Sequence, residues 1–412
     1  MKITIVGAGP SGLFLAHRLL ARSKHYQVQI FEKLDAPNSI DNSNSQEFGF
    51  GFGTKAQEWL KSIDGLWELL LEQSVSLESG RLILISRRHL CASLLQLLNN
   101  RYGTETIKAL PRLSVEFNTS VLDVFLESRE ILIEQASVQQ RIAYELLVAA
   151  DGVRSKVRSA MVASNPQIYA FKQKSRPHVW KVFQLPEQPN WERNLIRLQK
   201  RNFWSIDAFG ACIPHSDGRF SALIFWQPKG DNERLNPCGI STCEQIQVLL
   251  HQMKPTLPYP VLEQDSASAF LNERPSFEYW SECSCYHHVE GCVVAIGDAA
   301  HSMFSLLGQG CTAALADAIA LDTLLERYDN DLTLALPAFS DERVPEGQAA
   351  SNLSLIALVF FHPLFQLVYG IATTIWTKLL KRPSIFVRVN QVKYMEVLHE
   401  NQNWVRLGKR LF

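Results

Sequence analysis

The sequence predicts an α/β fold in which a parallel sheet carries glycine turns at its strand ends, a β-rich segment is inserted, and helices close the chain. Two short apolar runs, residues 3–6 and 293–296, each enter a glycine turn that opens a helical pattern. From about residue 175, by contrast, apolar and aromatic residues alternate between turn signals, as in an antiparallel sheet.

The composition is typical of a soluble globular protein, with 46% hydrophobic and 20% charged residues. The 412 residues are enough for more than one domain. Lys and Arg total 41, as do Asp and Glu, and this lack of net charge disfavours nucleic acid as a partner. The eight cysteines have no metal-binding spacing, so we expect no metal site, reduced thiols and a cytoplasmic location.

The N-terminal turn predicts a dinucleotide site. Gly7 allows the tight turn after the first strand, Gly9 lets the backbone approach a pyrophosphate, and Gly12 lets the helix over residues 13–21 pack closely. A second strand ends at Glu32, about 20 residues past the last glycine, where a carboxylate holds an adenosine ribose. Because a carboxylate there disfavours a 2′-phosphate, the pattern indicates bound FAD or NAD rather than NADP.

The later turn, Gly297-Asp298, has two interpretations. Asp298 could simply cap the following helix. The carboxylate could instead accept hydrogen bonds from sugar or ribityl hydroxyls, with Gly310 opening a helix whose N–H groups face an electron-rich ring or an anion. We favour the second interpretation because two distant turns then serve one cofactor. Asp151-Gly152 is another such turn, and its Asp could also be only a helix cap.

These elements divide the chain into a discontinuous dinucleotide-binding domain (1–174 and 275–345), a β-rich substrate domain (175–274) and a C-terminal helical region (346–412). Residues 35–53 are expected to form a loop over the cofactor. In the β-rich segment we expect strands at 179–185, 203–213 and 220–226. The sequence singles out no certain catalytic side chain.

Residues 353–376 raise the question of a membrane, because they are apolar for about the length that spans a bilayer. His362, Pro363 and Gln366 interrupt this segment, which favours a packed helix pair over a spanning helix. Basic residues follow it, so peripheral docking on a membrane surface through residues 353–382 stays open.

Three motifs stand in one order: residues 7–12 with Glu32, Asp151-Gly152 with Arg158, and Gly297-Asp298. This order resembles the FAD-dependent aromatic hydroxylases, the class A flavoprotein monooxygenases. The resemblance implies a Rossmann-like FAD-binding domain of the p-hydroxybenzoate hydroxylase type with an inserted β-sheet substrate domain. Within that family the sequence is similar to the kynurenine 3-monooxygenases over most of its length, including residues 85–87, 180–186 and 393–397.

The likeness also implies site residues. Those it assigns to FAD are Glu32, Lys33, Gly51, Arg87, Leu122, Asp298, Cys311 and Thr312, and the motifs themselves add Gly7, Gly9, Ser11, Gly12, Asp151 and Gly310. It assigns Tyr394 to the substrate. The substrate residues otherwise depart from those enzymes, since Arg81 stands where they have a tyrosine and the wall before Gly308 reads Phe304-Ser305-Leu306-Leu307. We also expect no counterpart of the membrane-spanning anchor of the eukaryotic members. We expect Arg81 or Tyr394 to bind an acidic group of the substrate, beside Leu307 and Gly308.

The reaction that the resemblance implies uses NADPH or NADH only transiently, because the chain has no second glycine fingerprint. Reduced FAD and O2 then form a flavin hydroperoxide, which hydroxylates a small aromatic or heteroaromatic substrate. The alternatives are another flavin-dependent oxidoreductase or a halogenase, the latter disfavoured by the lack of a Trp-x-Trp-x-Ile stretch, and a non-catalytic redox sensor that docks on a membrane surface. We expect a monomer or a homodimer.

Overall fold

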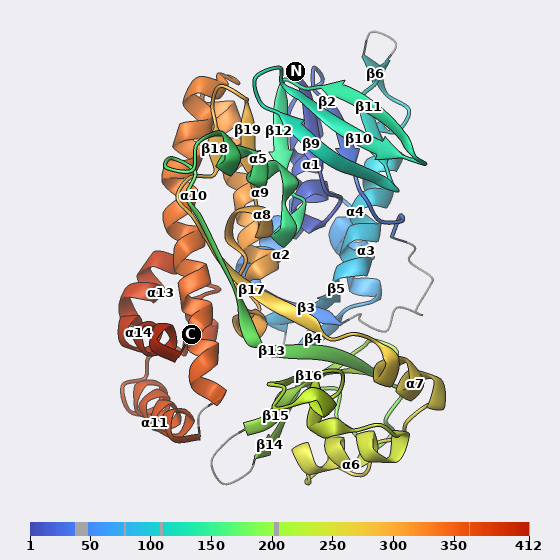
Figure 1. Ribbon diagram of the computed structural model, residues 1–412, viewed down its shortest axis with the longest axis vertical. Coiled ribbons are helices and arrows are strands. Elements are labelled where there is room, and N and C mark those ends of the chain that lie inside the picture. Colours follow the sequence, from blue (N-terminus) through green and yellow to red (C-terminus); the bar gives the residue numbers. More distant parts are fainter. Residues whose placement is uncertain (38–47, 78–79, 108–109, 202–205, 362, 412) are drawn as a thin grey trace.

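The computed structural model describes residues 1–37, 48–77, 80–107, 110–201, 206–361 and 363–411 (Figure 1). Its first sheet has the strand order β18-β19-β12-β1-β2-β8, and all neighbours pair in parallel except β18 with β19. These strands are β1 (Lys2–Val6), β2 (Gln27–Phe31), β8 (Leu113–Glu116), β12 (Leu146–Ala149), β18 (His287–His288) and β19 (Val293–Ala295). The predicted Rossmann-like α/β fold is confirmed.

Every residue of β12 and β19 is buried, as expected for central strands of a parallel sheet that is covered on both faces. Helix α1 packs against both α4 and α9, and α5 packs against β9 of a separate antiparallel sheet. These elements are α1 (Pro10–Arg22), α4 (Arg87–Tyr102), α5 (Lys156–Ser164), α9 (Gly310–Arg327), β9 (Thr119–Phe125), β10 (Glu130–Gln135) and β11 (Val138–Ala143).

The second large sheet lies below the first in Figure 1, with α6 and α7 on its outer side, and has the strand order β14-β15-β16-β13-β17. It has its own core, which includes Phe183, Trp226 and Phe270. The elements are β13 (Phe171–Leu185), β14 (Ile196–Arg201), β15 (Ile206–Pro214), β16 (Phe220–Trp226), β17 (Ser276–Cys283), α6 (Cys243–Met253) and α7 (Gln264–Asn272). The predicted strands correspond to β13, β15 and β16, whereas β14 was not predicted.

A small sheet corrects one expectation. Residues 49–53, expected within a loop, form strand β3 (Gly49–Gly53), which pairs antiparallel with β5 (Leu82–Ser86). The pairing with β5 and the buried Phe52 outweigh the low strand propensity of the three glycines. Residues 38–47 of that expected loop lie outside the described residues. The remaining elements of this region are α2 (Thr54–Lys61), α3 (Leu66–Glu72), β4 (Val75–Leu77), β6 (Thr106–Ile107) and β7 (Leu110–Pro111).

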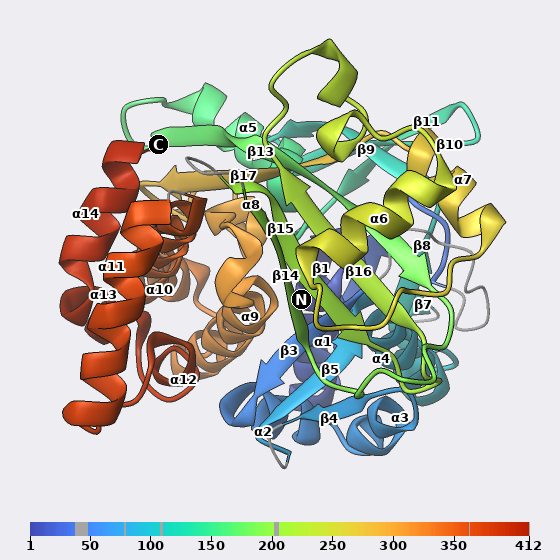
Figure 2. The same cartoon turned by 90° about the horizontal axis from the view of Figure 1, so that it is seen from below.

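The chain ends in helices that lie to one side of both sheets (Figure 2). The apolar segment at 353–376 is split between two environments. Leu355, Ile356 and Val359 are buried in the protein, whereas several side chains of α11 are exposed. Within the described residues, no helix combines the length and apolar character needed to cross a membrane. The elements are α10 (Leu332–Ser354), η6 (Leu355–Phe361), α11 (Pro363–Thr374), η7 (Ile375–Leu379), α12 (Ile385–Arg388), α13 (Tyr394–Glu400) and α14 (Gln402–Leu411).

Candidate cofactor and substrate site

Four turns meet at the carboxyl edge of the first sheet, since β1, β2, β12 and β19 run parallel and each leads into a turn there. Gly7, Glu32, Asp151 and Gly297 occupy these turns. The Gly7 N–H donates to the Phe31 carbonyl at 2.8 Å, which joins the first two turns directly. The edge therefore gathers three motifs that are far apart in the sequence.

The glycines of the first turn are required by the fold. Gly7 has φ +106°, and a side chain there would collide with the carbonyl oxygen of Ala150. A Cβ on Gly12 would collide with the Gly7 carbonyl oxygen. Because both obstacles are backbone atoms, neither can move aside cheaply. The N-terminus of α1 is thereby held at the sheet edge, where its free N–H groups suit an anion such as a pyrophosphate.

Glu32 points toward this turn. One carboxylate oxygen accepts a hydrogen bond from the Ala8 N–H at 2.8 Å, and the other accepts one from the Leu34 N–H at 3.0 Å. The carboxylate is therefore fixed beside the glycine turn, where a ribose would have to lie. Lys33, the next residue, is exposed.

Arg87 also reaches the first turn. Its Nη2 lies 3.5 Å from the position that a Cβ on Gly9 would occupy. Burial raises the pKa of the Cys91 thiol to about 11 and that of Cys311 to about 12, and the Arg87 guanidinium opposes the rise at both. The two cysteines are therefore neutral thiols close to Arg87. Because Cys311 is in the first turn of α9 and Arg87 also reaches Gly9, the start of α9 lies near the glycine turn.

The Gly297-Asp298 turn is anchored from α9. Gly297 has φ +60°, and a Cβ there would lie 3.4 Å from the Ser11 hydroxyl, so the two glycine turns are in contact. Asp317 is fully buried and accepts hydrogen bonds from the Gly297 N–H at 2.8 Å and from His301 Nε2 at 2.6 Å. Its other oxygen accepts from Arg343 Nε at 2.7 Å.

The charge of Asp317 is well compensated. Burial would raise the pKa of its carboxyl, but the interactions with His301 and Arg343 outweigh this and bring the pKa to about 2. Asp298 differs, because its side chain is exposed although the surrounding protein desolvates the carboxyl and raises its pKa. Asp298 is therefore accessible to a ligand, whereas the buried Asp317 is not.

The Asp151-Gly152 motif has a structural role. Asp151 accepts a hydrogen bond from the Lys156 N–H at 2.7 Å, at the start of α5, whose N-cap residue is Ser155. Arg158 in α5 is buried and donates to the Ala299 carbonyl at 2.8 Å. The motif therefore ties β12 and α5 to α8 (Asp298–His301).

The turn before α9 is held by Tyr394. Its hydroxyl donates to Gln309 Oε1 at 3.0 Å, and its N–H donates to Glu346 Oε2 at 2.8 Å. Burial raises the pKa of the Tyr394 phenol, which is therefore neutral. Gly308 has φ +64°, and no atom lies within 4 Å of the position of a Cβ there. Leu307, beside it, is buried.

The other predicted residues are spread more widely. Gly51 lies in β3 opposite Leu84, and Leu122 is the unpaired residue of a bulge in β9, a feature that redirects a side chain. Arg81 is exposed at the start of β5, whereas Arg87 follows its end. At about 3.3 Å per residue, these two arginines are separated by about 20 Å along the strand.

A buried ion pair that the sequence did not indicate supports the wall before Gly308. Arg176 in β13 pairs with Glu278 in β17, and both side chains are buried. Glu278 also accepts a hydrogen bond from the Ser305 N–H at 2.8 Å. The Arg176 guanidinium lies 5.2 Å from the ring centre of Phe304 and 5.6 Å from that of Phe225. The second sheet is therefore coupled to this wall.

Asp317, Arg343, Arg176 and Glu278 were all missed in the sequence. Each is a charged residue within a helix or strand, and no local motif distinguishes it from a surface charge. Their proximity arises only in the folded chain.

The residues at this edge fit an FAD. Glu32 and Asp298 present carboxylates here. The buried oxygens that have no hydrogen-bond partner among the described residues include two at this edge, Asp151 Oδ1 and Thr312 Oγ1. Such orphaned acceptors and hydroxyls are uncommon in proteins unless a ligand or water satisfies them.

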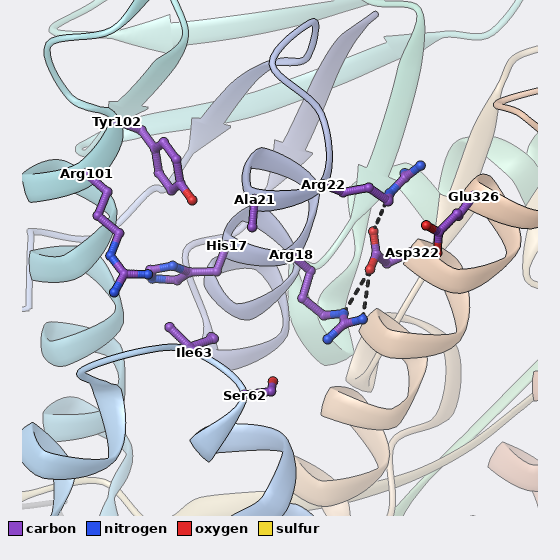
Figure 3. Close-up of a pocket in the computed structure, with 10 residues that line it drawn as sticks. All are labelled: His17, Arg18, Ala21, Arg22, Ser62, Ile63, Arg101, Tyr102, Asp322 and Glu326. Atoms are coloured by element: carbon purple, nitrogen blue, oxygen red, sulfur yellow. Dashed lines mark hydrogen bonds and ion pairs between the residues drawn. The ribbon is translucent and has the colours of Figure 1, made fainter.

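A separate hollow of about 330 Å³ lies between α1, α4 and α9 (Figure 3). It includes Asp322, which is 12 residues from Gly310 and thus about 18 Å along α9 from the cofactor edge. Asp322 accepts hydrogen bonds from Arg18 Nε at 3.0 Å and Arg22 Nε at 2.7 Å. These charges join α1 to α9, so the hollow is a by-product of a structural contact.

Comparisons with known proteins identify the family of the chain. Residues 96–351 match the family described as FAD binding domain, and residues 5–56 match the NAD(P)-binding Rossmann-like domain. Kynurenine 3-monooxygenase of Phaeosphaeria nodorum is 25% identical over 380 residues, which cover 86% of this chain and 76% of that protein. Violacein synthase of Chromobacterium violaceum is 26% identical over 390 residues, covering 86% and 84%.

The fold is shared with a solved structure, the tetrameric form of 2-methyl-3-hydroxypyridine-5-carboxylic acid oxygenase. The TM-score is 0.65 at 19% identity, with 86% of this chain and 89% of that chain covered. FAD is the cofactor and NAD(P)H the co-substrate. The chain therefore belongs to the FAD-dependent aromatic hydroxylases, and it is a flavin-dependent monooxygenase.

Proposed function

We propose that this enzyme hydroxylates a small aromatic or heteroaromatic compound with NAD(P)H and O2. The observation that carries the proposal is the contact between the two glycine turns, in which Ser11 lies against Gly297 and leaves Asp298 accessible beside Arg87. The relatives support it, since kynurenine and a hydroxypyridine carboxylic acid are the compounds in their names.

The residues at the sheet edge have distinct roles in this proposal. Glu32 binds the adenosine ribose, the N-terminus of α1 binds the pyrophosphate, and Asp298 binds the ribityl chain. Arg87 and the first turn of α9 lie against the rest of the cofactor. When bound, FAD supplies the redox chemistry, taking a hydride from the nicotinamide and passing electrons to O2.

The protein itself positions the substrate and excludes water. Leu307 and Gly308 form the wall that faces the ring, and the hydrogen bond from Tyr394 to Gln309 fixes that wall. Arg81 or Tyr394 binds an acidic group of the substrate. In this proposal residues 1–174 and 275–345 hold the cofactor, residues 175–274 cover the substrate, and residues 346–412 close the site.

Two measurements test the proposal. Asp298→Ala should purify folded with little or no flavin, and a normal flavin content in that variant would contradict the site. The unmodified enzyme should oxidise NAD(P)H faster when a suitable aromatic compound is present and should transfer one atom of labelled O2 to it. If a panel of aromatic acids neither alters the flavin spectrum nor stimulates NAD(P)H oxidation, the substrate class is wrong.

Partners and location form a less specific part of the proposal. The small-molecule partners are the substrate and O2. We propose that the protein is a monomer or homodimer in the cytoplasm and that residues 353–382 make peripheral contact with a membrane. A molar mass from light scattering would decide between the two oligomeric states.

A further inference from the structure

Helix α11 carries an apolar face that no part of the described chain covers. Leu364, Leu367, Val368 and Ile371 of α11, and Ile375 at the start of η7, are exposed by between 47% and 62%. Their spacing of three, four, seven and eleven residues from the first places them along one side of a helix. Figure 1 shows α11 at the lower edge of the molecule, below α13 and α14.

The opposite side of α11 is fixed to the protein. Tyr369 is buried and packs edge-on against Trp404, with ring centres 4.8 Å apart. Gln366 is hydrogen-bonded to Gln199 at 3.3 Å and to Arg201, both in β14. The orientation of α11 is therefore set by these contacts, and its apolar face is directed to solvent. Contiguous exposed apolar surface of this kind typically marks an interaction site.

The apolar face continues into a basic end. Leu379 is 75% exposed and Leu380 is 54% exposed, and the exposed Lys378, Lys381 and Arg382 lie among and beyond them. The Arg382 guanidinium stacks 4.7 Å from the ring centre of Trp376, which is itself partly exposed. An apolar stripe that ends in an aromatic ring and a group of cations is typical of a helix that lies in a lipid interface.

The charge of the whole region complements an anionic surface. No Asp or Glu stands between Glu346 and Glu396, whereas five Lys and Arg residues do, although the whole chain has no net charge. Clustered Lys and Arg attract anionic lipid headgroups. At 12 residues, α11 is too short to cross a bilayer, which takes about 20, so it would lie in the plane of the interface.

We propose that α11 and η7 dock this enzyme on the surface of an anionic lipid bilayer, through the apolar stripe with Lys378, Lys381 and Arg382 at its rim. This narrows the peripheral contact of the proposed function to residues 364–382, because residues 353–359 face the core wherever their burial is described. The docking does not depend on the identity of the aromatic substrate.

Flotation of the flavin-loaded protein with vesicles tests the docking. It should bind vesicles of phosphatidylcholine with phosphatidylglycerol and bind weakly to vesicles of phosphatidylcholine alone, and added salt should reduce the difference. Leu367→Glu combined with Ile371→Glu should weaken binding at least about tenfold, since it places charges in the apolar stripe. Replacing Lys378, Lys381 and Arg382 by Gln should remove the preference for the anionic vesicles.

A matched control is Val138→Glu, which changes a 70% exposed apolar residue of β11 and should leave vesicle binding unchanged. Strand β11 lies at the opposite end of the molecule from α11 in Figure 1. The proposal is overturned if neither vesicle binds, or if the double variant binds like the unmodified protein. The proposal is also overturned if the unmodified protein binds no vesicles and forms a dimer that the double variant does not form. A second copy of the chain would then cover the apolar stripe. Flavin content and NAD(P)H oxidation are measured separately, so failure of the docking is distinguishable from failure of the catalytic proposal.

Discussion

Asp317→Asn is the substitution that most directly tests how the flavin edge is held together. Asp317 is fully buried and accepts hydrogen bonds from three donors, on Gly297, His301 and Arg343. An Asn has the same shape but only one acceptor oxygen and an NH2 group that donates. At least one donor would therefore face another donor, and the buried charge of Arg343 would lose its counter-charge.

The expected cost follows from these contacts. Removing one partner of a buried ion pair costs about 3–5 kcal/mol. With an unfolding entropy of about 2.1 cal/mol/K per residue, the 412-residue chain changes Tm by roughly 1 °C for each kcal/mol, so Tm should fall by about 3–6 °C. FAD affinity should fall about tenfold or more, since the Gly297 N–H loses a charged acceptor worth about 1.5–3 kcal/mol.

The matched control is Asp322→Asn, which removes a buried carboxylate from the same helix. Asp322 is 4% exposed and pairs with Arg18 and Arg22, and it lies five residues, or about 7.5 Å along α9, beyond the Asp317 that holds Gly297. This control should lower Tm and leave FAD affinity within about twofold, as measured by titrating flavin into the deflavinated proteins. The reasoning fails if Asp317→Asn binds FAD normally, or if both variants lose affinity equally.

Three further outcomes are expected. Gly7→Ala should give no soluble flavoprotein. Gly152 has φ +76°, but no described atom lies within 4 Å of the position of a Cβ there, so Gly152→Ala should lower the free energy of unfolding in urea by only about 1 kcal/mol. Burial lowers the pKa of His17 to about 4, so its stabilising contribution is complete above about pH 6.5 and is lost as pH falls toward 4. His17→Gln should therefore remove about 2 kcal/mol of the stability difference between pH 7 and pH 5, and an unchanged difference would refute this. Tyr394→Phe should retain FAD but release more hydrogen peroxide per NAD(P)H oxidised, because Gln309 loses its hydrogen bond; an unchanged peroxide yield would argue against a positioning role.

The parallel sheet was predictable because its strands are buried on both faces. The apolar runs at 3–6 and 293–296 leave few alternatives to central strands. β14 was not predictable in the same way, since three of its six residues are Lys or Arg and it lies at the edge of its sheet. β3 was missed because three glycines in five residues suggest a loop, and only pairing with β5 makes it a strand.

Parts of the site that are local in sequence were also predictable. The structure brings to one edge Gly7, Glu32 and Asp298, which the motifs indicated, and Arg87, which the resemblance implied, although direct contact with FAD stays a prediction. The residues that hold this edge carry no motif. Asp317 lies 20 residues from Gly297 and 26 from Arg343, so the sequence alone does not indicate that the three meet.

Helix α9 explains why the two glycine turns stay in contact. Its first turn, Gly310 to Thr312, lies at the cofactor edge, and Asp317 in its second turn fixes Gly297. Further along, Asp322 joins α9 to the C-terminal half of α1 through Arg18 and Arg22. Because α1 begins at the first glycine turn and α9 begins beside the second, fixing the far ends of these two packed helices also sets the spacing of their N-termini. The Asp322 contacts that line the hollow in Figure 3 therefore fix the register of α1 against α9.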